Sequence, residues 1–129
     1  MGIFCSTPGI PLARAVPRKV SAYMLFTGAP LTASEAYQAG LISRLVADTA
    51  ALDTELKSIC DAIAAKPKGV IALGKRFYYK QMEMGLSSAF DEGGHVMVDN
   101  LRYADAQEGI SAFKDKRKPV WTHTDDKVL

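Results

Sequence analysis

The sequence has little cysteine and histidine, the residues that most often build metal sites, disulfide frameworks and nucleophilic centres. It contains 2 cysteines and 2 histidines in 129 residues. Cys5 and Cys60 are far apart and have no cysteine or histidine near them at ligand spacing, which excludes a zinc site and a disulfide framework. We expect both thiols to be buried or inert in a reducing compartment. For His95 and His123 the sequence names no nucleophile or carboxylate partner, so we expect packed or solvated side chains.

Long apolar runs and a strong excess of one charge are also missing. No segment approaches the roughly 18 apolar residues of a membrane-spanning helix, and residues 1–10 lack the order of a signal peptide. The formal net charge is +2, whereas nucleic-acid binders usually gather a stronger basic excess. Apolar residues make up 48% and charged residues 23% of the chain, which is typical of a globular domain. We expect one soluble cooperative unit, or a piece of one.

The first 47 residues predict a loop, two short helices and a strand. Prolines and a glycine within residues 4–17 predict a loop with at most a short helical turn, so residues 1–17 are assigned to a loop. Apolar spacing predicts a helix over residues 18–26. Thr32 and Glu35 match a capping box, and Gly40 suits the left-handed end of the helix that follows. The β-branched residues of Ile42–Val46 predict a short strand, which completes a helix-helix-strand region over residues 18–47.

Residues 48–129 are predicted to be helical, with apolar stripes over residues 52–64, 70–78 and 86–101 and a short helix carrying Ile110 and Phe113 within residues 105–121. Gly69, Gly74 and Lys75 have the spacing of a phosphate-binding P-loop. However, the residues between the glycines form a helical stripe, Arg76 stands where the P-loop needs Ser or Thr, and a helix comes before instead of a strand. These features exclude a nucleotide site. The adjacent glycines Gly93 and Gly94 indicate close helix packing.

Three further patterns have competing interpretations. The apolar face of residues 86–101 could be a ligand wall, but core packing is favoured. Asp91 and Glu92 are adjacent on a helix and point in different directions, so they form a solvated face and no catalytic pair. The basic cluster in residues 114–118 is a solvated helix end, an anionic-ligand site or a nucleic-acid patch. The last interpretation is disfavoured because interleaved aromatic residues are absent.

Two motifs in register indicate a family. The run "LFTGAPLTASEAYQAGLISRLV", residues 25–46, resembles the segment of the crotonase superfamily, the enoyl-CoA hydratase/isomerase family, that reads T-G, A-x-E-A, G-L and V. The stretch "EGISAFKDKRKPVW", residues 108–121, resembles the family's C-terminal E-G-x-x-A-F-x-x-K-R signature. The resemblance covers nearly the whole chain, and "FCSTPG" together with "KRKPVW" indicates one particular branch of the family.

The resemblance implies a mainly α fold: the C-terminal helical part of a crotonase-like α/β spiral fold, with at most one short strand. In the family, the N-terminal spiral supplies the oxyanion-hole N–H groups and the catalytic glutamates, which would lie upstream of Met1. We therefore expect no catalytic residue and no metal site in this chain. The family's G-A-G-G-T stretch corresponds to "PGIPL", residues 8–12. This departure counts against ordinary hydratase activity.

The resemblance also implies a ligand and partners. The ligand is acyl-CoA, a coenzyme A thioester, and no other cofactor is expected. Lys116 would approach the phosphates or adenine end of coenzyme A, supported by Arg117, with Phe113 packed inward on the same side of the last helical turn and Met97 at the tunnel. The full form is expected to be a mitochondrial homo-oligomer, a trimer or dimer of trimers, in fatty acid metabolism. The alternative is a non-catalytic acyl-CoA-binding or oligomerisation module.

Overall fold

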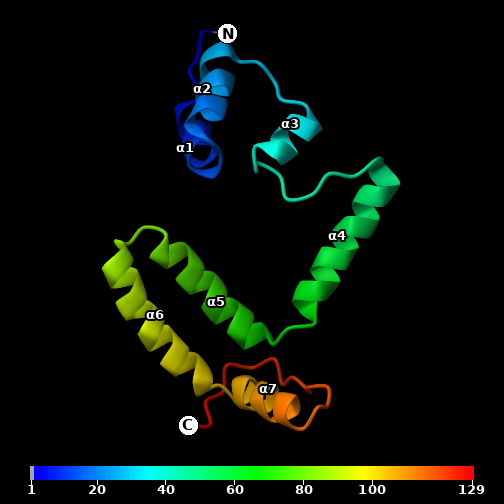
Figure 1. Cartoon of the computed structure of the whole chain (residues 1–129), viewed down its shortest axis with the longest axis vertical. Helices are drawn as coiled ribbons and strands as arrows, with labels where there is room; N and C mark the ends of the chain where they lie inside the picture. Colours follow the sequence, from blue (N-terminus) through cyan, green and yellow to red (C-terminus); the bar gives the residue numbers. More distant parts are fainter. Residues whose placement is uncertain (1) are drawn as a thin grey trace. The chain divides into compact units, whose positions relative to one another are not determined.

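The computed structural model describes residues 2–129, and these residues are mainly helical, as the sequence predicts (Figure 1). The only β pairing among them is an isolated antiparallel bridge between Tyr103 and Lys127. None of the helices in the described part of the chain is both long and apolar enough to cross a bilayer. The helices are α1 (Ser6–Ala15), α2 (Arg18–Thr27), α3 (Ala33–Gln38), α4 (Thr49–Ala64), α5 (Lys68–Gln81), α6 (Leu86–Leu101) and α7 (Ala104–Lys114).

The chain divides into two compact units, the first ending at Glu55 and the second running from Leu56 to Leu129. In the first unit α1 packs against α2. The predicted loop over residues 1–17 is therefore wrong, because residues 6–15 form a helix that contains Pro11. A methyl group on Gly9 would come within 3.2 Å of the Leu25 side chain. Helix α1 thus packs closely on α2 at Gly9, although Pro11 cannot donate a backbone hydrogen bond within the helix.

Helix α3 begins and ends as the sequence predicts. The Thr32 hydroxyl accepts a hydrogen bond from the Glu35 backbone N–H, and the Glu35 carboxylate accepts one from the Thr32 N–H. At the other end Gly40 has a φ of 77°, and the Leu41 N–H donates to the Ala36 carbonyl at 2.9 Å. This pattern is a Schellman motif.

The strand predicted over residues 42–46 is wrong, because residues 42 and 43 form a bend and residues 44–46 have no regular secondary structure. A strand needs a neighbour to satisfy its backbone N–H and C=O groups, and no described residue pairs with this segment. Its first N–H, that of Ile42, is directed back to the Ala36 carbonyl at 3.4 Å. The Arg44 guanidinium instead bonds the Glu55 carboxylate at 3.0 Å.

In the second unit α5 packs against α6, and both pack against α7. The exclusion of a P-loop is confirmed, since Gly69, Gly74 and Lys75 all lie within α5. A methyl group on Gly93 would come within 3.2 Å of the Phe77 ring, whereas Gly94 has open space. Close packing at the paired glycines is therefore confirmed for the first of them only.

The core is small, and much apolar surface is exposed. The buried apolar side chains are Val16, Ala36, Tyr103 and Ala112. Leu86 and Phe90 of α6 are 76% and 73% exposed. The interpretation of this apolar face as core packing is therefore wrong within the described residues. Both thiols are exposed, so of the two alternatives expected for them, buried or inert, the first is wrong and the second stays a prediction. Cys5 is the N-cap residue before α1, and Cys60 lies on α4, which has no buried residue.

Candidate functional site

The segment that follows α7, residues 115–120, carries three basic side chains and is called the basic segment below. It has an unusual backbone. Helix α7 ends in a Schellman motif: the Lys116 N–H donates to the Phe113 carbonyl at 3.3 Å, and the Arg117 N–H donates to the Ala112 carbonyl at 3.0 Å. Lys116 occupies the position where glycine is usual, with a left-handed φ of 53°. A lysine there is less stable than glycine by roughly 1–2 kcal/mol. Such outliers are concentrated at functional sites.

A carboxylate holds this segment in place. The Glu108 carboxylate accepts two hydrogen bonds from the Arg117 guanidinium, at 2.5 and 2.8 Å, and one from the Val120 N–H at 2.8 Å. These hydrogen bonds lower the pKa of Glu108 to about 2, and those from Arg117 have a larger effect than the one from Val120. Hydrogen bonding to Glu108 correspondingly raises the pKa of Arg117. Because Arg117 is committed to this bidentate pair, its guanidinium positions the segment.

The structure gathers three of the four predicted site residues. Phe113, Lys116 and Arg117 lie at the C-terminal end of α7, while Met97 lies on α6, before α7 begins. Phe113 is 88% exposed, so the prediction that its ring packs inward is wrong for this chain. Lys116 also lies beyond the end of α7, and the assumed shared helical face does not exist. The helix ends at Lys114, two residues before Lys116.

Sequence reasoning missed the buried carboxylate of Asp105, which is 1% exposed. It accepts hydrogen bonds from the Thr122 N–H at 2.7 Å, the Thr122 hydroxyl at 2.9 Å and the His123 N–H at 2.9 Å. Burial acts to raise the pKa of Asp105, but the bonds from Thr122 and His123 outweigh it and the pKa is lowered. The partners are 17 and 18 residues away, a separation that no local pattern reveals.

The C-terminal tail is anchored on several helices at once. The Trp121 indole N–H donates to the Ala65 carbonyl at 2.9 Å. The His123 ring Nδ1 accepts a hydrogen bond from the Lys68 N–H at 3.4 Å. The His123 side chain, for which the sequence names no nucleophile or carboxylate partner, thus bonds a backbone N–H, while its own backbone N–H donates to Asp105. The tail thus returns along α7 toward its start, where the Ala104 N–H donates to the Asp126 carbonyl at 2.8 Å (Figure 1).

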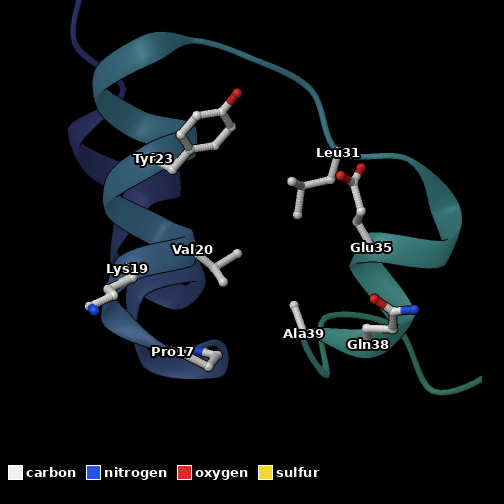
Figure 2. Close-up of a pocket in the computed structure, with 8 residues that line it drawn as sticks. All are labelled: Pro17, Lys19, Val20, Tyr23, Leu31, Glu35, Gln38 and Ala39. Carbon is white, nitrogen blue, oxygen red and sulfur yellow. The ribbon is translucent and has the colours of Figure 1, made fainter.

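A second candidate site lies in the first unit, between α2 and α3 (Figure 2). It is an open pocket of about 510 Å³ whose apolar lining includes Val20 and Leu31. Glu35 lines it too, but its carboxylate accepts hydrogen bonds from the Thr32 hydroxyl at 2.7 Å and the Thr32 N–H at 2.8 Å. Both hydrogen bonds lower the pKa of Glu35, and the bond from the Thr32 hydroxyl has the larger effect. An ionised carboxylate committed to a helix cap is a poor general acid.

Comparison with known proteins identifies the family. The enoyl-CoA hydratase/isomerase family model matches residues 2–124 of the chain. The chain belongs to the enoyl-CoA hydratase/isomerase family. Within this crotonase-type family the match is to the C-terminal portion, as the two motifs predict. Glu108 and Arg117, which belong to the C-terminal motif of the resemblance, are the two partners of the ion pair that holds the basic segment.

Several relatives agree with the branch that "FCSTPG" and "KRKPVW" indicated. The chain is 51% identical over 123 residues to the human "Enoyl-CoA hydratase domain-containing protein 3, mitochondrial", covering 95% of this chain and 40% of that protein. It is 50% identical over 123 residues to the rat protein of the same name, and this match covers 95% of this chain and 41% of the rat protein. The chain thus spans about two fifths of the length of the curated relatives it matches.

Solved structures of family members share the fold. The crystal structure of human enoyl coenzyme A hydratase domain-containing protein 3 matches with a TM-score of 0.90 and 52% identity, covering 93% of this chain and 47% of that one. An enoyl-CoA hydratase from Mycobacterium smegmatis matches with a TM-score of 0.90 and 44% identity. This match covers 95% of this chain and 47% of the other. The mainly helical arrangement is therefore part of a crotonase-type fold.

Proposed function

We propose that this chain is the C-terminal helical part of an enoyl-CoA hydratase/isomerase-like protein of acyl-CoA metabolism, and that its role is to bind the coenzyme A portion of an acyl-CoA. The supporting observation is the basic segment after α7. Lys116 of the family signature has a left-handed backbone, and the Glu108 to Arg117 pair holds the loop that carries it. A fixed loop limits the conformational entropy that Lys116 would lose on binding a phosphate.

The proposal assigns no catalytic residue to these 129 residues. Hydration of an enoyl thioester needs two oxyanion donors and a carboxylate or other group that moves protons. The carboxylates with the most structured surroundings are already committed: Asp105 and Glu108 anchor the tail, and Glu35 caps α3. Each of the three also has a lowered pKa, the opposite of what a general acid requires.

The exposed apolar faces support association as a second part of the proposal. Side chains such as Leu86, Phe90 and Phe113 are more than two-thirds exposed, and large uncovered patches are typical of interaction surfaces. Homo-oligomerisation, as a trimer or dimer of trimers, and a mitochondrial location follow by analogy with the family and with the relatives' names. An assembly module that binds no acyl-CoA is the second candidate, and the same exposed faces favour it.

A pair of assays separates these functions. The 129-residue chain is compared with a chimera in which the N-terminal part of the human relative precedes residues 2–129. We expect the chain to leave the enone absorbance of crotonyl-CoA unchanged and the chimera to bind coenzyme A by calorimetry. Turnover by the chain that a point mutation within residues 1–129 abolishes would contradict the non-catalytic assignment. A folded chimera that fails to bind coenzyme A would favour the assembly module.

A further inference from the structure

The second unit contains a concentration of cations that the proposed function does not use. Between Asp61 and Glu83 every charged side chain is basic. Three of these, Lys66, Lys68 and Lys75, line one pocket of about 420 Å³. None of the three has an ion-pair partner within the described residues. The pocket therefore has a basic rim without an internal counter-ion.

The floor of the same pocket is apolar. Ile63 comes from the end of α4 and Ile71 from α5. The two side chains are 54% and 40% exposed, so hydrocarbon surface lies uncovered beside the lysine ammonium groups. A small hydrophilic anion would leave this floor in contact with water, and a neutral apolar ligand would leave the cations without a partner. The combination favours a ligand that has both an anionic group and a hydrocarbon chain.

The third wall of the pocket is held in place by the C-terminal tail. His123 lines the pocket, and its ring Nδ1 accepts a hydrogen bond from the Lys68 N–H at 3.4 Å. The indole of Trp121 bonds the Ala65 carbonyl at the link between α4 and α5. These contacts join the three segments that line the pocket, so its walls belong to one packed unit.

We propose that this pocket binds a single-chain anionic amphiphile of the fatty-acid carboxylate class. The carboxylate would lie among the ammonium groups of Lys66, Lys68 and Lys75, and the alkyl chain would cover Ile63 and Ile71. The site is separate from the coenzyme A site proposed above, because its lining does not include Lys116 or the rest of the basic segment. A volume of about 420 Å³ lies within the usual range for small-molecule sites.

The test titrates the full 129-residue chain with dodecanoate below its micelle concentration, by calorimetry and by the fluorescence of Trp121, the chain's single tryptophan. Acetate supplies the anion without the chain, and dodecanol supplies the chain without the anion. The test variant is Lys66→Glu/Lys75→Glu, and the control is Lys114→Glu/Lys118→Glu, which makes the same change in net charge at two lysines that do not line the pocket. All four lysines are exposed, so neither variant removes a packed side chain, and circular dichroism checks the fold.

We expect dodecanoate to bind, with acetate and dodecanol each weaker by about tenfold or more. The pocket variant should lose about tenfold or more in dodecanoate affinity, and the control should stay within about twofold of the unmodified chain. Saturating coenzyme A should leave dodecanoate binding unchanged. Undetectable dodecanoate binding, dodecanol binding of equal strength, an equal loss in the control variant or competition by coenzyme A would each overturn the proposal.

Discussion

The carbonyl oxygen of Thr124 lies against the backbone of Gly69, so close that a Cβ atom at Gly69 would be 2.2 Å from it. The C-terminal tail therefore packs directly on the first turn of α5, and only glycine permits this contact. Gly74, one and a half turns further along the same helix, has nothing within 4 Å of its Cβ position. The two glycines form a matched pair for mutation.

We predict that Gly69→Ala displaces the tail while Gly74→Ala stabilises the chain. An added methyl group at Gly69 must push away backbone atoms, which cannot rotate aside as a side chain can. At Gly74 alanine should raise the free energy of unfolding by about 0.5–1 kcal/mol through the lower helix propensity of glycine. Urea unfolding followed by the fluorescence of Trp121 measures both effects. Equal behaviour of the two variants would contradict the close approach.

Replacing Asp105 should free the same tail from the other side. In Asp105→Ala the N–H groups of Thr122 and His123 lose their acceptor, and the expected loss is about 1–3 kcal/mol. Asp105→Asn keeps the size but turns one acceptor oxygen into a donor, so we expect it to restore only part of the stability. Hydrogen exchange at the two amides provides the measurement. Unchanged protection in Asp105→Ala would show that other contacts hold the tail.

Acid should weaken the anchoring of the basic segment in a defined pH range. Glu108 has a pKa of about 2 in the folded chain, against an ordinary value of 4.5. A carboxyl group with a lowered pKa contributes stability that is fully present above the ordinary value and is lost as pH falls toward the lowered one. The urea midpoint should therefore fall between pH 4.5 and about 2, and Glu108→Gln should flatten this dependence. Identical slopes for the two proteins would refute the assignment.

Lys116→Ala in the chimera that carries the N-terminal part of the human relative should weaken coenzyme A binding by about tenfold or more, because a charge-assisted bond to phosphate contributes roughly 1.5–3 kcal/mol. Added salt should reduce the difference if part of it is long-range attraction. Lys118→Ala, two residues further on, is the control and should change the calorimetric dissociation constant little. An unchanged constant in Lys116→Ala would leave the segment as a solvated helix end.

The isolated chain should associate at micromolar concentration. Leu86 and Phe90 of α6 are 76% and 73% exposed, and apolar surface of this kind favours assembly. Leu86→Glu/Phe90→Glu should move the sedimentation distribution toward monomer while the helical circular dichroism signal persists. A compact, well-folded monomer of the unmodified chain would count against this prediction.

The sequence by itself determined the elements whose signals are local. Thr32 and Glu35 cap α3 through a hydrogen-bond pair three residues apart, and Gly40 ends it because glycine adopts a left-handed backbone without strain. The signature around Glu108 and Lys116 likewise located the candidate site from adjacent residues alone. Capping, helix periodicity and short motifs depend on neighbours within a turn or two, so they are readable without the fold.

Tertiary structure decided the rest, since the deciding contacts join distant residues. Helix α1 contains Pro11 and packs through Gly9 on Leu25, a pairing that proline content cannot reveal. The segment after α3 is no strand, because none of residues 2–129 pairs with it. Asp105 anchors the tail across 17 residues, and Arg117 became a positioning group only when the chain turned back to bring Glu108 beside it. Burial and pairing of charges depend on which surfaces meet, and only the folded chain brings those surfaces together.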